Sequence, residues 1–386
     1  MVKVNYITRP WFFDISIEFI KELKEHVELH VILIIAPATL GYLGISKTDG
    51  EKYLNKTLNI KDVLKGDNAL KFAEYFDGAN VFCKFEQHKE TNYHNALAWI
   101  KLLSKNKNLL KADYTIIESL SLADWYFLLR FINKKLAYII HDPIAHSGEE
   151  RGRVDKLNNI YFPYINQFFT YSEFAGKLFK QNFPKYKNLV SVFQMPVYHS
   201  LNLGGKQPAE VKSKVVFFGR ISPYKGVELF YKAASNLANR YPATAFIIAG
   251  KTIDDYHPAF LSDNPHNNIT IINKFIDLDE LYELMNDASF CVLPYLDATQ
   301  SGVIMTAYAF NLPVLVSDCE GLLEYCFNTT HFSFKNGDAA DLETKMEKLL
   351  NSGKLLAENK IQIANYNAFN ISEKNVRTLL NALTVL

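Results

Sequence analysis

Short, solidly apolar runs alternate with amphipathic segments along most of the chain, and this alternation constrains the fold more than any other feature. The runs Glu28–Ile35, Leu136–His141 and Phe290–Leu293 are almost entirely apolar, which is typical of strands buried on both faces of a sheet. Between residues 227 and 241 the apolar positions recur at steps of three and four, which is typical of one helix face. Strands that alternate with helices in this way predict an α/β fold with parallel sheets.

The pattern restarts after residue 200, so the 386 residues are expected to form two domains. A turn-rich polar segment at 202–214 is the predicted linker. We expect an N-terminal domain at 1–200, a C-terminal domain at 201–371 and a last helix within 372–386. Further strands are expected at Val2–Ile7, Ala79–Cys83, Tyr114–Glu118, Gln167–Tyr171, Val215–Phe218, Ala245–Ala249, Ile269–Ile272 and Pro313–Ser317, and further helices at Ile15–His26, Leu278–Asn286, Val303–Phe310 and Asp338–Leu350.

Composition excludes several classes of protein. With 48% hydrophobic and 22% charged residues the chain is neither disordered nor collagen-like. A net charge of +1 gives no overall field that would favour nucleic acid, so no nucleic-acid partner is expected. The four cysteines (Cys83, Cys291, Cys319 and Cys326) lack the spacing of a metal site, and we interpret them as reduced, buried thiols in a reducing compartment.

The N-terminus lacks the pattern of a signal peptide, and the longest apolar run, Val31–Leu43, is too short to span a bilayer. The expected location is therefore the cytoplasm. Residues 1–200 nevertheless carry 26 basic against 21 acidic residues, and Lys101–Lys111 is a basic amphipathic stretch. This stretch has two interpretations: a solvated helix face, or a surface that meets acidic lipid head groups at the inner face of the membrane.

The segment Phe217–Gly226 is the first that can carry chemistry. A strand runs into Gly219, a short loop follows, and a helix is expected to start near Gly226. Ligands bind at the carboxyl ends of strands in open α/β sheets. Arg220 and Lys225 would place two cations beside a helix N-terminus, which suits a diphosphate. The alternative is a strand–loop–helix junction with two surface cations.

The segment Leu293–Phe310 repeats this arrangement. A strand ends at Leu293, and a polar loop at 297–302 leads into a helix of small residues. Ser301, Gly302 and Val303 would expose backbone N–H groups at the first turn, where a phosphate can bind. An ordinary N-cap by Thr299 or Ser301 is the alternative interpretation.

Two further loops follow strands. In Asp318–Glu324, Gly321 is expected to form a turn, and Glu324 is expected in the first turn of the next helix, where a carboxylate can accept hydrogen bonds from sugar hydroxyls or simply stabilise the helix dipole. In the first half, polar residues crowd after the strand that ends at His141, namely Asp142, His146 and Glu149. Their spacing matches no familiar metal motif, so a polar substrate loop is favoured over a metal site.

Together these segments resemble family 4 glycosyltransferases. The matching pieces are Gly-Arg-x4-Lys-Gly after a strand, Leu-Pro-Tyr followed by Thr-Gln-Ser-Gly-Val, and Glu-Gly-Leu-Leu-Glu, within about residues 213–335. The Ala-Thr-Gln-Ser-Gly loop is similar to that of a subset of the family. The resemblance implies the GT-B fold, with two Rossmann-like domains facing across a cleft and a last helix that packs back on the first domain.

The resemblance also implies roles for residues. It assigns the donor diphosphate to Arg220, Lys225, Ser301, Gly302 and Val303. It places His141 near the transferred sugar as the catalytic residue, with Asp142, His146 and Glu149 on the acceptor side. The family commonly has two glutamates separated by seven intervening residues, where this chain has Ala298 and Thr306. Donor sugar and ribose contacts are therefore expected from the remaining polar residues of these loops, namely Asp297, Thr299, Gln300 and Glu324.

The implied activity is a glycosyltransferase that moves a sugar from UDP- or GDP-sugar to a glycan or lipid-linked oligosaccharide. It is expected to be retaining, free of metal and other cofactors, and part of cell-surface or capsular polysaccharide biosynthesis. Two alternatives stay open. One is a sugar-nucleotide 2-epimerase of the same fold, and the other is an inactive sugar-nucleotide-binding partner.

Overall fold

The computed structural model describes residues 1–43, 45–53, 56–64, 72, 74–86, 93–119, 124, 131, 134–144, 158–202, 213–253 and 256–384. These residues form two compact units. Unit 1 contains the described residues up to 144, those from 158 to 196 and those from 371 onward, and unit 2 contains those between 197 and 370. The domain boundaries predicted from the sequence lie after residues 200 and 371, whereas the two units change between residues 196 and 197 and between 370 and 371. Most of the predicted linker, 203–212, lies outside the described residues.

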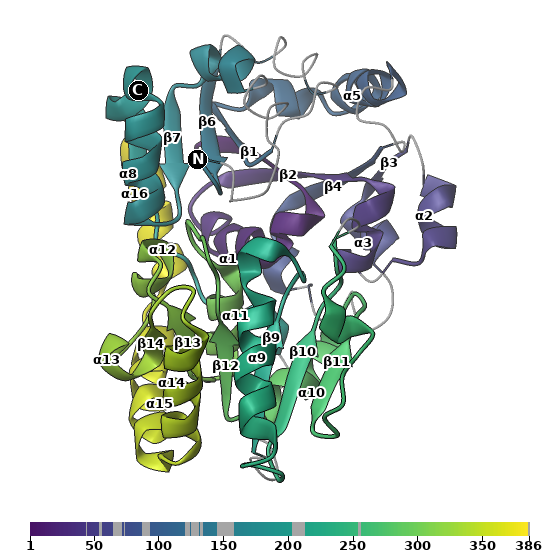
Figure 1. Cartoon of the computed structure of the whole chain (residues 1–386). Helices are drawn as coiled ribbons and strands as arrows, with labels where there is room; N and C mark the ends of the chain where they lie inside the picture. Colours follow the sequence, from purple (N-terminus) through teal and green to yellow (C-terminus); the bar gives the residue numbers. More distant parts are fainter. Residues whose placement is uncertain are drawn as a thin grey trace. The chain divides into compact units, whose positions relative to one another are not determined.

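Unit 1 is built on one twisted sheet (Figure 1). Its strands, within the described residues, follow the order β3-β4-β2-β1-β5-β6-β7-β8, and all neighbouring pairs are parallel except β3 with β4. Seven of the eight residues of β2 are buried, which explains its uninterrupted apolar sequence. The strands are β1 (Lys3–Thr8), β2 (Glu28–Ile35), β3 (Thr57–Asn59), β4 (Asn80–Phe85), β5 (Tyr114–Ile117), β6 (Lys135–Ile140), β7 (Gln167–Thr170) and β8 (Val190–Val192).

Helices complete unit 1. The last helix, α16, packs on α1, and its Asn375 side chain exchanges hydrogen bonds of 2.9 and 2.7 Å with the backbone of Gln194. The C-terminal end of the chain therefore contributes to the core of the first unit. Within the described residues, the helices of this unit are α1 (Phe13–Leu23), α2 (Lys47–Tyr53), α3 (Ile60–Val63), α5 (Tyr93–Lys105), α8 (Glu173–Asn182) and α16 (Ile371–Thr384).

Unit 2 contains a second sheet, which is parallel throughout its described strands. The order is β11-β10-β9-β12-β13-β14. From β9 the chain adds β10 and β11 on one side and then returns to add β12, β13 and β14 on the other, so the strand order reverses between β9 and β12. These strands are β9 (Lys214–Phe218), β10 (Ala245–Ala249), β11 (Ile269–Ile272), β12 (Phe290–Leu293), β13 (Val314–Ser317) and β14 (Ser333–Phe334). Figure 1 labels the helices of this unit, namely α9 (Val227–Ala238), α10 (Leu278–Asn286), α11 (Gly302–Ala309), α12 (Glu320–Leu323), α13 (Thr329–Phe332), α14 (Ala339–Leu350) and α15 (Gly353–Asn367).

Some sequence predictions need correction. The basic stretch Lys101–Lys111 is not one helix, because α5 ends at Lys105 and a separate 3-10 turn covers Lys107–Lys111. The cysteines were expected to be buried, yet Cys319 and Cys326 are only partly so, since both lie in loops after β13. All four are free thiols, as predicted. None of the described helices has the length and hydrophobicity needed to cross a membrane.

Candidate active site

The reversal of strand order in unit 2 brings two predicted loops together. The loop after β9 begins at Gly219 and the loop after β12 begins at Pro294, and these strands are parallel neighbours. A Cβ atom on Gly226 would lie 1.9 Å from the carbonyl oxygen of Pro294, so only glycine allows this approach. The backbone N–H of Leu296 also donates to the carbonyl of Tyr224 over 2.7 Å. The two loops therefore form one surface at the position where ligands bind in such sheets.

Both predicted cations lie on this surface beside tyrosines. The guanidinium of Arg220 is exposed and donates through Nη2 to the hydroxyl of Tyr224, 3.2 Å away. The ammonium of Lys225 lies 3.8 Å from the ring centroid of Tyr295 and 5.2 Å from that of Tyr224. Two positive charges and two aromatic rings are thus grouped within the facing loops.

The first turn of α11 lies at the same surface. Ser301 is the N-cap by its extended backbone, but its side chain makes no capping hydrogen bond, and its hydroxyl donates instead to the hydroxyl of Tyr295, 3.4 Å away. The predicted N-cap interaction of Ser301 is therefore absent, since that hydroxyl is directed elsewhere. The backbone N–H groups of Gly302 and Val303 in this turn are not satisfied by a side-chain cap, which leaves them suited to an anion.

The remaining predicted donor residues lie around this turn. Thr299 is 1% exposed, whereas Asp297 and Gln300 are half-buried. A Cβ atom on Gly321 would come within 2.5 Å of the backbone oxygens of Ala298 and Thr299, so α12 lies directly against the loop.

Two predictions about the segment 318–324 were wrong. Gly321 lies within α12 and is required for its close packing, not for a turn. Glu324 is the C-cap of α12, whereas we expected it in the first turn, because the helix starts four residues earlier. The acid in that first turn is Glu320, and Glu324 is exposed at the other end.

In unit 1, His141 lies directly after β6 and contacts both aromatic and acidic side chains. Its ring is stacked on Phe12, with centroids 3.8 Å apart and planes at 6°. Its Nε2 atom lies 3.5 Å from Oε1 of Glu118, whose side chain is fully buried. The hydroxyl of Ser16 donates to the other oxygen of Glu118 over 2.5 Å. Burial raises the pKa of Tyr6 well above its usual value, and the negative charge of Glu118 raises it further.

Glu118 was not among the predicted site residues. The sequence does contain a signal for Glu118, because this residue is an acid that directly follows the buried strand β5, which lies next to β6. Sequence reasoning placed it inside the strand and gave it no role. Asp142 is half-buried beside His141, and the predicted acceptor residues His146 and Glu149 lie outside the described residues.

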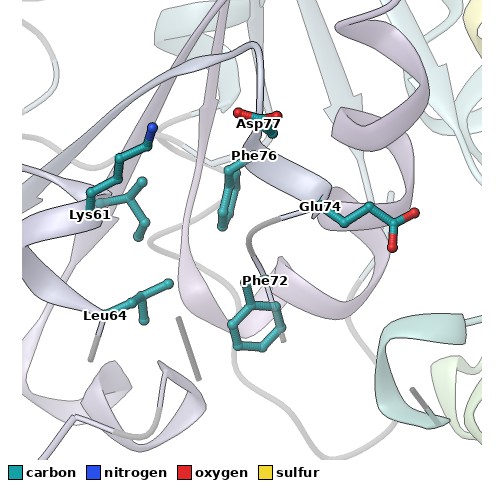
Figure 2. Close-up of a pocket in the computed structure, with 7 residues that line it drawn as sticks. Lys61, Leu64, Phe72, Glu74, Phe76 and Asp77 are labelled. Atoms are coloured by element: carbon teal, nitrogen blue, oxygen red, sulfur yellow. The ribbon is translucent and has the colours of Figure 1, made fainter. Parts of the chain in front are cut away.

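Unit 1 also contains a cavity of about 460 Å³, separate from the residues predicted from sequence. Figure 2 shows that Leu64, Phe72 and Phe76 face a common space, whereas the carboxylate of Glu74 points out of it. None of the predicted site residues is among the described residues that line this cavity. The described part of the chain also contains no group of three or more His, Cys, Asp or Glu side chains arranged to hold a metal ion.

The predicted family can now be compared with known proteins. Residues 212–352 match the family model described as glycosyl transferases group 1. The chain has no match among curated proteins. Several solved structures are similar over nearly the whole chain at low sequence identity. Anabaena HepE, in complex with UDP and glucose, has a TM-score of 0.68 at 15% identity and covers 99% of this chain and 100% of its own.

The other two structures agree with this fold. A glycosyltransferase from Rickettsia africae has a TM-score of 0.64 at 13% identity, covering 99% of this chain and 97% of its own. Sucrose-phosphate synthase from Thermosynechococcus elongatus has a TM-score of 0.67 at 12% identity, covering all of both chains. The predicted GT-B fold is confirmed by these structures, and the prediction of a glycosyltransferase by the family match. Residues 212–352, within the second unit, therefore match a group 1 glycosyl transferase domain, and the chain has the GT-B fold.

Proposed function

We propose that this protein transfers a sugar from a nucleotide-sugar, UDP- or GDP-linked, to a glycan or lipid-linked oligosaccharide. The observation that carries the proposal is the surface where Arg220 and Lys225 lie beside the uncapped first turn of α11. UDP in the HepE structures, which share the fold, favours UDP as the nucleotide. We also propose that the chain belongs to the subset with an Ala-Thr-Gln-Ser-Gly loop.

The chemistry follows from the charge of the leaving group. When the bond between the sugar and the β-phosphate breaks, negative charge develops on the phosphate oxygens. The two cations and the N–H groups of Gly302 and Val303 would stabilise that charge more in the transition state than in the ground state. Side-chain cations would supply the positive charge, so the proposal requires no metal or other cofactor.

The sugar and acceptor contacts extend the proposal. His141 would hydrogen bond to a hydroxyl of the transferred sugar, since a neutral imidazole can both donate and accept. Asp297, Thr299, Gln300 and Glu324 would contact the donor sugar and ribose, and Asp142, His146 and Glu149 the acceptor. Retention of anomeric configuration by front-face attack is proposed from the family resemblance.

The proposed setting is polysaccharide biosynthesis in the cytoplasm, at the inner face of the membrane. Lys101, Lys105, Lys107 and Lys111 are exposed, while Leu109 between them is buried. These lysines would meet acidic lipid head groups. Sedimentation with phosphatidylglycerol vesicles, but not with phosphatidylcholine vesicles, is the expected result, and equal behaviour with both would exclude this contact.

The central test measures donor binding and donor chemistry. A thermal-shift panel of UDP, GDP, ADP and their sugars should identify one nucleotide that stabilises the protein, by about 2.7 kcal/mol at a hundredfold excess over Kd. The matching nucleotide-sugar should then release nucleoside diphosphate. Binding without release would favour the inactive binding partner, and a product with inverted sugar C2 would favour the 2-epimerase.

A further inference from the structure

Tyr295, which follows β12, is a buried aromatic residue at the centre of the candidate donor site. Its side chain is fully enclosed, and burial raises the pKa of its hydroxyl far above the usual value. One face of the ring meets the ammonium of Lys225, 3.8 Å from the centroid. At the edge of the ring, its hydroxyl accepts from Ser301, the N-cap of α11. The ring therefore connects a cation to the helix turn proposed to bind phosphate.

Tyr224 contacts the second cation through its hydroxyl. It is 5% exposed, and its hydroxyl accepts a hydrogen bond from Arg220. Its ring meets that of Tyr295 edge-on, with centroids 6.4 Å apart and planes at 71°, a favourable geometry for aromatic pairs. The backbone bond from Leu296 to Tyr224 fixes the two tyrosines relative to each other.

An aromatic neighbour differs from a carboxylate in what it does to a cation. A ring attracts an ammonium through its quadrupole and restricts a long, flexible side chain, but it brings no negative charge. A carboxylate would order the same lysine and cancel its charge. A site that must attract a diphosphate gains from the first kind of partner.

We propose that Tyr295 is a positioning residue that holds the Lys225 ammonium at the first turn of α11, ready for the donor diphosphate, and that Tyr224 does the same for Arg220. This rests on the proposed function, since it assumes that the site binds a nucleoside diphosphate. It goes beyond it by assigning a role to two tyrosines that would otherwise be counted as core residues. Lys225 has other neighbours as well, so the proposal concerns the contribution of the ring and does not require it to be the sole partner.

The test compares Tyr295→Phe with Tyr295→Leu, each in the wild-type protein and in Lys225→Ala, by calorimetric titration with UDP and with pyrophosphate. Phe keeps the ring, so affinity should stay within about twofold of wild type. Leu removes the ring, and affinity should fall roughly fivefold to thirtyfold, as a cation–π contact of about 1–2 kcal/mol predicts. In Lys225→Ala, Tyr295→Leu should cause no further loss, because the ring acts through the lysine.

Several outcomes would overturn the proposal. A loss from Tyr295→Leu that is equally large without Lys225 would show that the ring only supports the loop. An equal loss in Tyr295→Phe would assign the effect to the hydroxyl. Tyr308→Leu, a buried tyrosine elsewhere on α11 that bonds to the carbonyl of Tyr325, controls for general destabilisation. If Tyr295→Leu does not fold, Tyr295→Trp should bind at least as well as Tyr295→Phe, and weaker binding contradicts the proposal. A wild-type protein that binds no nucleoside diphosphate would refute the proposed function itself.

Discussion

An arginine follows the first strand of each sheet, and the two arginines have opposite environments. Arg9, after β1 in unit 1, is 1% exposed and pairs with the buried carboxylates of Glu86, at 3.1 Å, and Asp124, at 3.2 Å. Arg220, after β9 in unit 2, is exposed and donates to the neutral hydroxyl of Tyr224. Both sheets reverse strand order at this position, β1 beside β5 and β9 beside β12. The same framework thus places a buried cation between two carboxylates in one unit and an exposed cation beside a tyrosine in the other.

Arg9 belongs to a network of buried charged and polar side chains. Lys84 donates to the second oxygen of Glu86 over 2.7 Å, and the indole of Trp99 donates to Asp124 over 2.8 Å. The side chains of the four charged residues are at most 2% exposed. Among the described residues of this network, two cations face two carboxylates, and their charges balance. In unit 2, Arg220 is exposed and contacts the hydroxyl of Tyr224, and the ammonium of Lys225 lies over the ring of Tyr295.

The sharpest contrast between the units should be in stability. Arg9→Ala removes one of the two cations that face two buried carboxylates, which leaves a buried negative charge uncompensated, and the free energy of unfolding should fall by about 3–5 kcal/mol. Arg220→Ala, at an exposed position, should change it by less than about 0.5 kcal/mol. Urea unfolding followed by circular dichroism measures both. Similar losses in the two variants would remove the distinction between the two arginines.

The rate of turnover, in contrast to stability, should fall strongly when the unit 2 cations are removed. Arg220→Ala and Lys225→Ala should each lower the rate of nucleoside diphosphate release by about 10²–10³-fold, as expected for a donor to a developing oxyanion. Nucleoside diphosphate affinity should fall as well, with the fold kept. The matched controls are Arg240→Ala and Lys274→Ala, which remove surface cations paired with glutamates elsewhere in unit 2. Wild-type affinity in both site variants would contradict the diphosphate assignment.

His141→Ala should separate the sugar from the nucleotide. Loss of a positioned polar group should lower kcat by about 10²-fold, while affinity for bare UDP changes by less than about twofold, since UDP lacks the sugar. Initial rates and calorimetry give the two values. His30→Ala is the control, because His30 is a buried histidine within β2 of the same unit. A variant with normal turnover would show that His141 is only a packing residue.

Glu118→Gln should have the smallest effect of the series. It keeps the size of the side chain beside His141 but removes the charge 3.5 Å from Nε2. We expect about a tenfold fall in kcat with KM nearly unchanged, since the glutamine would orient the imidazole less firmly. Glu28→Gln, at a surface ion pair of the same unit, serves as control. A change in KM alone would place Glu118 with substrate binding instead.

The sequence by itself indicated most of the elements and the resemblance to glycosyltransferases. The expected bounds coincide with β2, β10, β11, α10 and β12, because apolar spacing is a local property that a strand or helix must satisfy wherever it lies. The motifs from Gly219 to Val303 likewise indicate the glycosyltransferase domain, because each is a short, contiguous run of residues that is recognisable without knowledge of its neighbours in space.

Only the tertiary structure decided which side chains meet. Spacing along the chain does not show that Tyr295 lies under Lys225, because that depends on the adjacency of β9 and β12, which are separated by two other strands in sequence. The pairing of Glu118 with His141 depends in the same way on β5 lying beside β6. Glu324 was misplaced because the start of α12 is set by its packing on the loop at Ala298, through Gly321. Local pattern fixes an element, but strand order and close packing fix its neighbours, and the chemistry of a site depends on the neighbours.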